Sequence, residues 1–133
     1  MERIISTPVK FRVNGGNLCL NVSVRENKDI ADIRNVLKDY PNFFYALDWV
    51  DGRKKEPIRL SKEVLDMYDI ENLNPGLRIG SKYMKGSCCE HDGNLSICTI
   101  YRNEFLSLDY LHELEIVYKL LKGERLMNLN GMP

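Results

Sequence analysis

The sequence predicts a single α+β domain, and three observations carry that prediction. Apolar and polar residues alternate between residues 9 and 24, as they do in strands with one buried face. Apolar residues recur at steps of three and four within 28–40 and again within 107–122, which is the period of an amphipathic helix. A chain of 133 residues, 44% of them hydrophobic, buries enough surface to fold without a metal or a disulfide.

The first elements are two strands and a helix. The alternating apolar residues of the two strands are Val9, Phe11, Val13, Leu18, Leu20, Val22 and Val24. Asn-Gly-Gly-Asn stands between the two arms and tolerates the positive φ angles of a tight hairpin turn. The apolar face of the helix comprises Ile30, Ile33, Val36, Leu37 and Tyr40. Asn27 or Asp29 caps its start, and Pro41 ends it.

Four shorter elements follow. The aromatic-rich segment 43–52 predicts a strand that ends at a turn, and 56–61 predicts a short strand. Residues 61–73 predict one or two helical turns, and 75–83 predict a further strand with Leu77 and Ile79 facing inward.

The order of these elements resembles a ubiquitin-like β-grasp over residues 8–82. The similarity is sharpest in "VLDMYDIENLNPGLRI" from Val64 to Ile79, and "LNVSVRENKDIADIRNVLKDYPN" is similar to the family's second strand and first helix. The resemblance implies that the first strand and the strand at 77–79 are neighbours. It also implies one packed core, made of Val9, Phe11, Val13, Leu20, Val22, Ile33, Leu37, Leu77 and Ile79.

The departures from the family pattern indicate a non-conjugated relative. Conjugated members end in a diglycine, whereas Gly15-Gly16 lies in the first hairpin and the strand at 77–79 runs on into "GSKYMKGSCC". The exposed positions of that strand are Arg78 and Gly80, so the family's apolar recognition patch is not expected. We therefore expect residues 1–84 to form a β-grasp core that binds other proteins.

Residues 85–133 are expected to add a hairpin, a helix and a tail packed on that core. Asp92-Gly93 predicts a two-residue turn that places His91 opposite Asn94. The helix has an apolar stripe formed by Leu108, Leu111, Leu114, Val117, Leu120 and Leu121. Ser107 or Asp109 starts it and Gly123 follows its end.

Cysteine and histidine gather on the second hairpin. The predicted register places Cys89, His91 and Cys98 on one face and Cys88 on the other. A structural zinc needs four ligands, and the fourth would have to be Cys19 or His112. We interpret the cysteines as reduced thiols and His112 as a solvated residue, and we expect no metal, no cofactor and no disulfide.

Motifs for catalysis are missing from the sequence. It contains no G-x-S-x-G, G-x4-G-K-[ST], G-x-G-x-x-G or H-E-x-x-H pattern. The residue types of a Cys-His dyad occur in "CCEH", but nothing in the pattern supplies an orienting third group. We therefore expect no catalytic residues, no enzyme activity and no small-molecule substrate.

Two segments are candidates for binding. The basic loop and its flank carry Arg53, Lys54, Lys55, Arg59 and Lys62, and the uncharged tail carries Leu126, Met127, Leu129 and Met132. The loop is either a solvated turn or a surface for an acidic protein or an RNA backbone. The tail is either frayed or ordered against another molecule. We expect the residues after Gly123 to reach outward to a partner, so that ending the chain at Arg125 preserves thermal stability but weakens association.

The function expected from these patterns is non-catalytic docking onto a larger protein or complex. The alternative is an accessory factor on a ribonucleoprotein such as the ribosome, which contacts RNA through the basic loop and the tail. Nineteen basic residues balance nineteen acidic ones, which disfavours a protein whose main task is to wrap a phosphate backbone. The N-terminus lacks the apolar run of a signal peptide or a membrane span, so we expect a cytoplasmic protein without a membrane partner.

Overall fold

The structure is a computed structural model that describes residues 4–13, 16–25, 55–73, 76–101 and 103–126. In chain order the elements are β1 (Ile4–Val13), β2 (Gly16–Arg25), β3 (Lys55–Pro57), α3 (Lys62–Met67), β4 (Ile70–Asn72), β5 (Leu77–Ile79), β6 (Lys82–Met84), β7 (Gly86–His91), β8 (Asn94–Tyr101), β9 (Glu104–Leu108) and α4 (Leu111–Lys122). The predicted α+β class is confirmed. The helix predicted at 28–39 and the strand predicted at 43–52 lie outside the described residues.

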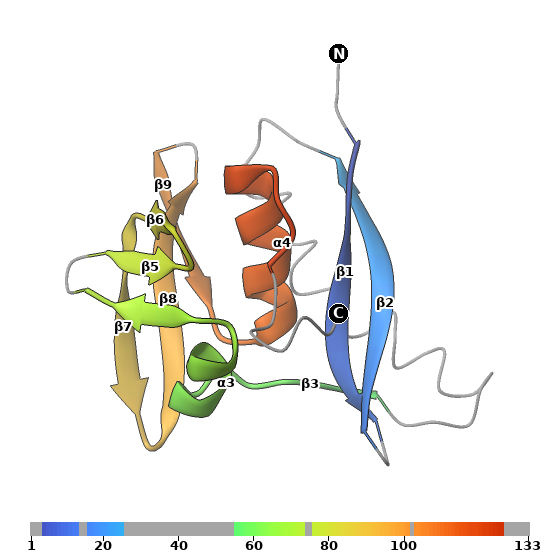
Figure 1. Cartoon of the computed structure of the whole chain (residues 1–133), viewed down its shortest axis with the longest axis horizontal. Coiled ribbons are helices and arrows are strands. Elements are labelled where there is room, and N and C mark those ends of the chain that lie inside the picture. Colours follow the sequence, from blue (N-terminus) through green and yellow to red (C-terminus); the bar gives the residue numbers. More distant parts are fainter. Residues whose placement is uncertain (1–3, 14–15, 26–54, 74–75, 102, 127–133) are drawn as a thin grey trace.

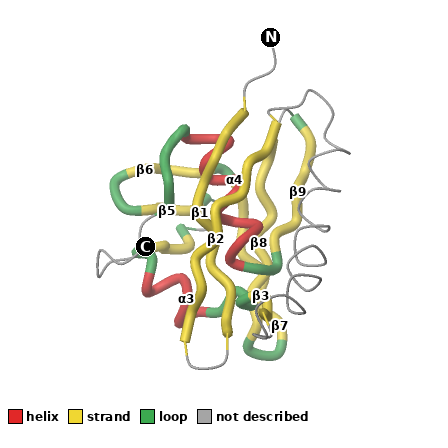
Figure 2. Tube along the Cα trace, turned by 90° about the vertical axis from the view of Figure 1, so that its right-hand side faces the viewer, coloured by secondary structure: helices red, strands yellow, loops and turns green. Residues whose placement is uncertain are grey.

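The described strands form three antiparallel sheets, in the orders β2-β1-β3, β4-β5-β6 and β7-β8-β9. Figure 1 shows α4 between the β2-β1-β3 sheet on one side and the other two sheets on the opposite side. Figure 2, turned by 90°, shows β1 and β2 in front of α4, in agreement with that layering. Helix α4 is therefore the middle layer of the molecule.

Both predicted hairpins are confirmed, and the second also has its predicted register. Val13 lies opposite Gly16 in the β1–β2 pair, and His91 lies opposite Asn94 in the β7–β8 pair. The β7–β8 turn is closed by Asp92 and Gly93, whose φ angles are 51° and 81°. Aspartate and glycine tolerate these left-handed angles, which explains why this dipeptide predicted the turn correctly.

Helix α4 is buried on nearly all sides. Every residue from Leu111 to Tyr118 is buried, because sheets pack against the helix from two directions. The predicted end of the helix is confirmed, since Gly123 adopts a left-handed conformation with φ 72°. The predicted start at Ser107 or Asp109 is wrong. Strand β9 continues to Leu108, and Tyr110 becomes the N-cap.

The described strands do not form the strand pairing that we expected for a β-grasp. Strand β1 pairs with β2 along its length and with β3 at Phe11–Val13. Strand β5 pairs with β4 and β6, because the chain reverses through Gly80, at φ 60°, and Ser81. The first strand and the strand at 77–79 are therefore not hydrogen-bonded neighbours, contrary to expectation. The β-grasp relationship itself stays a prediction.

Four of the residues expected in the core share one buried cluster. Val9, Phe11, Leu77 and Ile79 belong to one buried cluster, and Val13 is also buried. The strand at 77–79 is inward-facing at Leu77 and Ile79 and half-exposed at Arg78, as its alternation predicts. The side chains of Leu20 and Val22, and residues Ile33 and Leu37, lie outside what the structure describes.

Candidate binding groove

A groove of about 500 Å³ opens where α3 and β4 meet the β7–β8 hairpin. Its lining residues are Lys62, Leu65, Asp66, Asp69, Ile70, Glu71, Asn72, Arg78, Cys88, Glu90 and Leu95. They come from five elements and the turn between α3 and β4. This volume lies within the range of ligand-binding sites in proteins.

The floor of the groove is apolar. Leu65, Ile70 and Leu95 are buried, and Cys88 is half-buried against the same core. Helix α3 is positioned by Ser61, whose Oγ accepts the N–H of Val64 at 3.3 Å. The chain then reverses at Asp69, where φ is 54°, and enters β4. Ile70 is thereby placed beside Leu65, from the preceding helix, on the groove lining.

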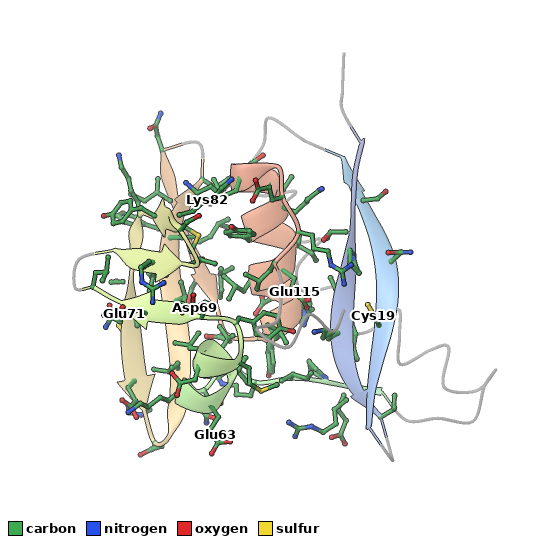
Figure 3. All side chains as sticks on the ribbon, viewed as in Figure 1. Cys19, Glu63, Asp69, Glu71, Lys82 and Glu115 are labelled. Carbon is green, nitrogen blue, oxygen red and sulfur yellow. The ribbon has the colours of Figure 1, made fainter. Side chains whose placement is uncertain are left out.

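The rim carries Arg78, which is held by two carboxylates. Its Nη2 lies 3.1 Å from Asp69 Oδ1 and 3.2 Å from Glu71 Oε2. Its Nη1 donates to the carbonyl oxygen of Gly80 at 2.7 Å, and its Nε donates to Glu71 at 3.2 Å. The hydrogen bonds that Arg78 donates to Asp69 and then Glu71 raise the pKa of Arg78. All three guanidinium nitrogens are engaged, so this cation is poorly placed to capture an anion. Figure 3 shows the labelled Asp69 and Glu71 side chains on the face occupied by β4 and β5.

The remaining charges make the groove acidic. Asp66 and Glu90 are exposed on the lining, and neither carboxylate forms an ion pair within the part of the chain that the structure describes. Lys62 is the second cation of the lining. Four acidic side chains therefore face two basic ones, an excess of two negative charges. A positively charged group suits this groove better than an anion.

The groove lining lacks an activated nucleophile. Cys88 contributes a thiol, and burial, followed by the nearby Cys89, raises its pKa. A raised pKa keeps the thiol protonated, whereas catalytic cysteines need a thiolate. Cys88 is therefore not activated as a nucleophile.

The structure describes only part of the basic segment that the sequence singled out. Arg53 and Lys54 lie outside the described residues, and Lys55 is in β3. Arg59 Nη2 lies 4.0 Å from Asp109 Oδ1, and its guanidinium carbon is 5.5 Å from the Tyr110 ring centroid. Lys62 begins α3 and lines the acidic groove. Arg59 and Lys62 thus have different surroundings.

Leu126 corrects the prediction for the tail. We expected it to reach outward, but it is 4% exposed and belongs to the buried core cluster. Gly123 reverses the chain after α4, and Glu124 then pairs with Lys82 Nζ at 2.6 Å. The segment therefore returns toward the domain. Met127, Leu129 and Met132 lie outside the described residues.

The faces predicted for the sulfur-bearing hairpin are confirmed. Cys89 and His91 are exposed and Cys98 is half-buried, while Cys88 lies on the face that packs against the core. All four cysteines are free thiols in the structure. The described residues contain no group of three His, Cys, Asp or Glu side chains placed to hold a metal ion.

His112 is not solvated, contrary to expectation. It is 0% exposed, and its ring stacks on Phe11 at 5.1 Å and on Tyr110 at 5.8 Å between centroids. The reason is the layering, because α4 is covered both by β1 and by the opposite sheets. His112 is a packing residue of that seam.

A buried polar cluster joins α4 to β1, and sequence reasoning did not predict it. Glu115 Oε1 accepts the backbone N–H of Lys10 at 2.9 Å, and Lys10 Nζ donates to Tyr68 Oη at 2.6 Å. Burial raises the pKa of Glu115 to about 7 and lowers that of Lys10. The labelled Glu115 lies between α4 and β1 in Figure 3. The sequence contained an indication of this buried carboxylate, because Glu115 stands between Leu114 and Ile116 in an apolar helix.

No protein-family model, no curated protein and no solved structure matches this chain. Within the described ranges, none of the helices has the length and hydrophobicity needed to span a membrane.

Proposed function

We propose that this protein is a non-catalytic binding module that docks onto a larger protein or complex through the groove between α3, β4 and the β7–β8 hairpin. The observation that carries the proposal is the combination of a buried apolar floor, Leu65, Ile70 and Leu95, with a charged rim. In such sites the apolar surface supplies affinity, and a few placed polar groups fix orientation.

The charge of the groove favours protein over RNA as the partner. Its excess of two negative charges repels a phosphate backbone, and the guanidinium of Arg78 is already engaged by Asp69 and Glu71. The alternative, an accessory factor on a ribonucleoprotein, rests on the basic loop. Arg59, at the end of that loop, already lies against Asp109 and Tyr110.

The ubiquitin-like relationship is part of this proposal. Many non-conjugated members of that superfamily bind other proteins, and the segments 20–42 and 64–79 carry the resemblance. The relationship requires a helix at 28–39 packed against β1 and β2. An experimental structure of residues 26–54 that shows strands there instead would rule it out.

Affinity purification from native lysate, with and without ribonuclease, tests the docking function. The wild-type chain is compared with Glu90→Lys, which alters the groove, and with Glu63→Lys, which alters an exposed carboxylate outside its lining. We expect wild type and Glu63→Lys to retain the same ribonuclease-resistant partner, and Glu90→Lys to lose most of it. Ribonuclease-sensitive capture, equal for all three chains, would favour the ribonucleoprotein alternative.

A further inference from the structure

We infer, building on the proposed docking function, that the groove accepts a short segment of a partner protein that presents one lysine or arginine side chain. The aliphatic stem of that side chain lies along the floor formed by Leu65, Ile70 and Leu95. Its cationic head reaches the carboxylates of Asp66 and Glu90.

Two of the four carboxylates that line the groove remain available to a ligand. Asp69 and Glu71 are occupied by Arg78, with nitrogen–oxygen distances of 3.1–3.2 Å. Asp66 and Glu90 are exposed, line the same groove, and have no ion-pair partner in the described ranges of the chain. The whole chain is neutral, so the negative excess of the groove is a local field rather than a property of the molecule.

The apolar floor then selects the type of cation. Long basic side chains bury their methylene stems on apolar surface and keep the charged head in a polar environment. Leu65, Ile70 and Leu95 line the same groove as the two carboxylates and supply such a surface. A small hydrated cation gains nothing from this floor, whereas an aliphatic side chain gains nothing from the carboxylates. Lysine and arginine combine both parts.

The second cation of the rim limits the charge of the occupant. Lys62 is exposed at the start of α3 and lines the groove together with Asp66, one turn away on the same helix. A run of several basic residues would meet this ammonium group. One basic residue flanked by neutral ones avoids that repulsion. A volume of about 500 Å³ also suits a short segment rather than an extended protein surface.

Mixtures of peptides that share one fixed central residue test this inference on the full-length protein. Each mixture holds capped pentapeptides with randomised neutral flanks and a central lysine, arginine, norleucine or glutamate. Binding is followed by amide chemical shifts of Leu65, Ile70, Glu90 and Leu95. We expect the lysine and arginine mixtures to bind at least about tenfold more tightly than the norleucine mixture, with no saturable binding of the glutamate mixture. Added salt should weaken the binding of the two basic mixtures.

Matched variants assign the binding to the two carboxylates. Asp66→Asn and Glu90→Gln should each reduce the preference for lysine over norleucine, whereas Glu63→Gln, on the same helix but outside the groove, should leave it unchanged. Equal binding of the norleucine mixture would overturn the inference and leave the docking function standing. The inference would also be overturned if lysine amide bound as tightly as the peptides, or if none of the mixtures bound at the groove. The docking function fails separately, if Glu90→Lys retains the native partner in full.

Discussion

The carboxyl group of Glu115 lies between α4 and β1 with 3% of the residue exposed. Burial disfavours its ionised form and is the largest influence on its pKa. The hydrogen bond from the Lys10 backbone and the charges of Lys10 and Arg125 act in the opposite direction, while Cys19 on β2 also faces this cluster. The balance leaves the pKa of Glu115 at about 7, against an ordinary value of 4.5.

This shift predicts how stability depends on pH. Between pH 4.5 and 7 the folded chain binds more protons at Glu115 than the unfolded chain, so its contribution to the free energy of unfolding falls as pH rises. The loss amounts to about 3 kcal/mol, from ~1.4 kcal/mol per pKa unit. Glu115→Gln should remove this slope and raise stability at pH 8. Urea denaturation at a series of pH values measures it.

The control for this prediction is Glu63→Gln, because Glu63 is exposed on α3. That variant should keep the wild-type slope. If Glu115→Gln keeps the slope as well, the carboxyl group of Glu115 is not the source of the pH dependence.

Backbone proximity at Gly86 gives a second prediction at the residue scale. A Cβ atom built at Gly86, whose φ is 154°, would lie 2.3 Å from the carbonyl oxygen of Cys98 on β8. Gly93 has φ 81° but no atom within 4 Å of its Cβ position. Gly93→Ala should therefore lower the free energy of unfolding only because alanine disfavours the left-handed conformation, by ~1–2 kcal/mol. Gly86→Ala must also displace a strand and should cost more. Urea denaturation of the two variants measures their losses of stability, and equal losses would contradict a clash at Gly86.

Polar residues on α4 show where prediction from sequence reached its limit. His112, Glu113 and Glu115 are buried, although polar residues on an amphipathic helix are ordinarily expected to face solvent. The apolar stripe correctly predicted that one face of α4 is covered. It could not show that a second sheet covers the other face, because that depends on how β1 packs in three dimensions.

At the scale of elements, the end of α4 determines where the following residues go. Gly123 takes the left-handed conformation and turns the chain back, so that Leu126 reaches the core with 4% exposure. Leu126→Ala should destabilise the protein by about 2–5 kcal/mol, as buried leucines do. Ending the chain at Arg125 removes the same side chain and should also be destabilising, which replaces our expectation that this truncation preserves stability. Thermal denaturation measures both.

The matched control is Leu73→Ala, because Leu73 is 45% exposed. Surface substitutions of this kind usually change stability by less than ~0.5 kcal/mol. A Leu126→Ala loss no larger than that of Leu73→Ala would show that Leu126 does not belong to the core.

Local elements were predictable where one short stretch specifies them. Asp92-Gly93 determined the register of β7 and β8, and Ser61 with the following apolar residues determined α3. The groove was not predictable, because its lining joins side chains from α3 and β4 with Arg78, Cys88, Glu90 and Leu95. No single motif connects these segments. Only the packing of α3 and β4 against the β7–β8 hairpin brings their side chains together.

For the molecule as a whole, the position of α4 predicts how the protein unfolds. The helix packs between the β2-β1-β3 sheet and the other two sheets, and its residues share one buried cluster with β1, β5, β8 and β9. Neither side therefore has a complete core without α4, and we expect the described sheets to unfold together.

Leu114→Ala tests this cooperativity, because Leu114 is 0% exposed in the middle layer. The substitution should lower the free energy of global unfolding by about 2–5 kcal/mol. Native-state hydrogen exchange should show the same loss of protection at Phe11 in β1 and at Ile97 in β8. Met67→Ala, at a residue 45% exposed on α3, should leave both values unchanged. If β1 loses protection while β8 keeps it, the β2-β1-β3 sheet detaches as a separate unit, and the shared-layer account of α4 is wrong.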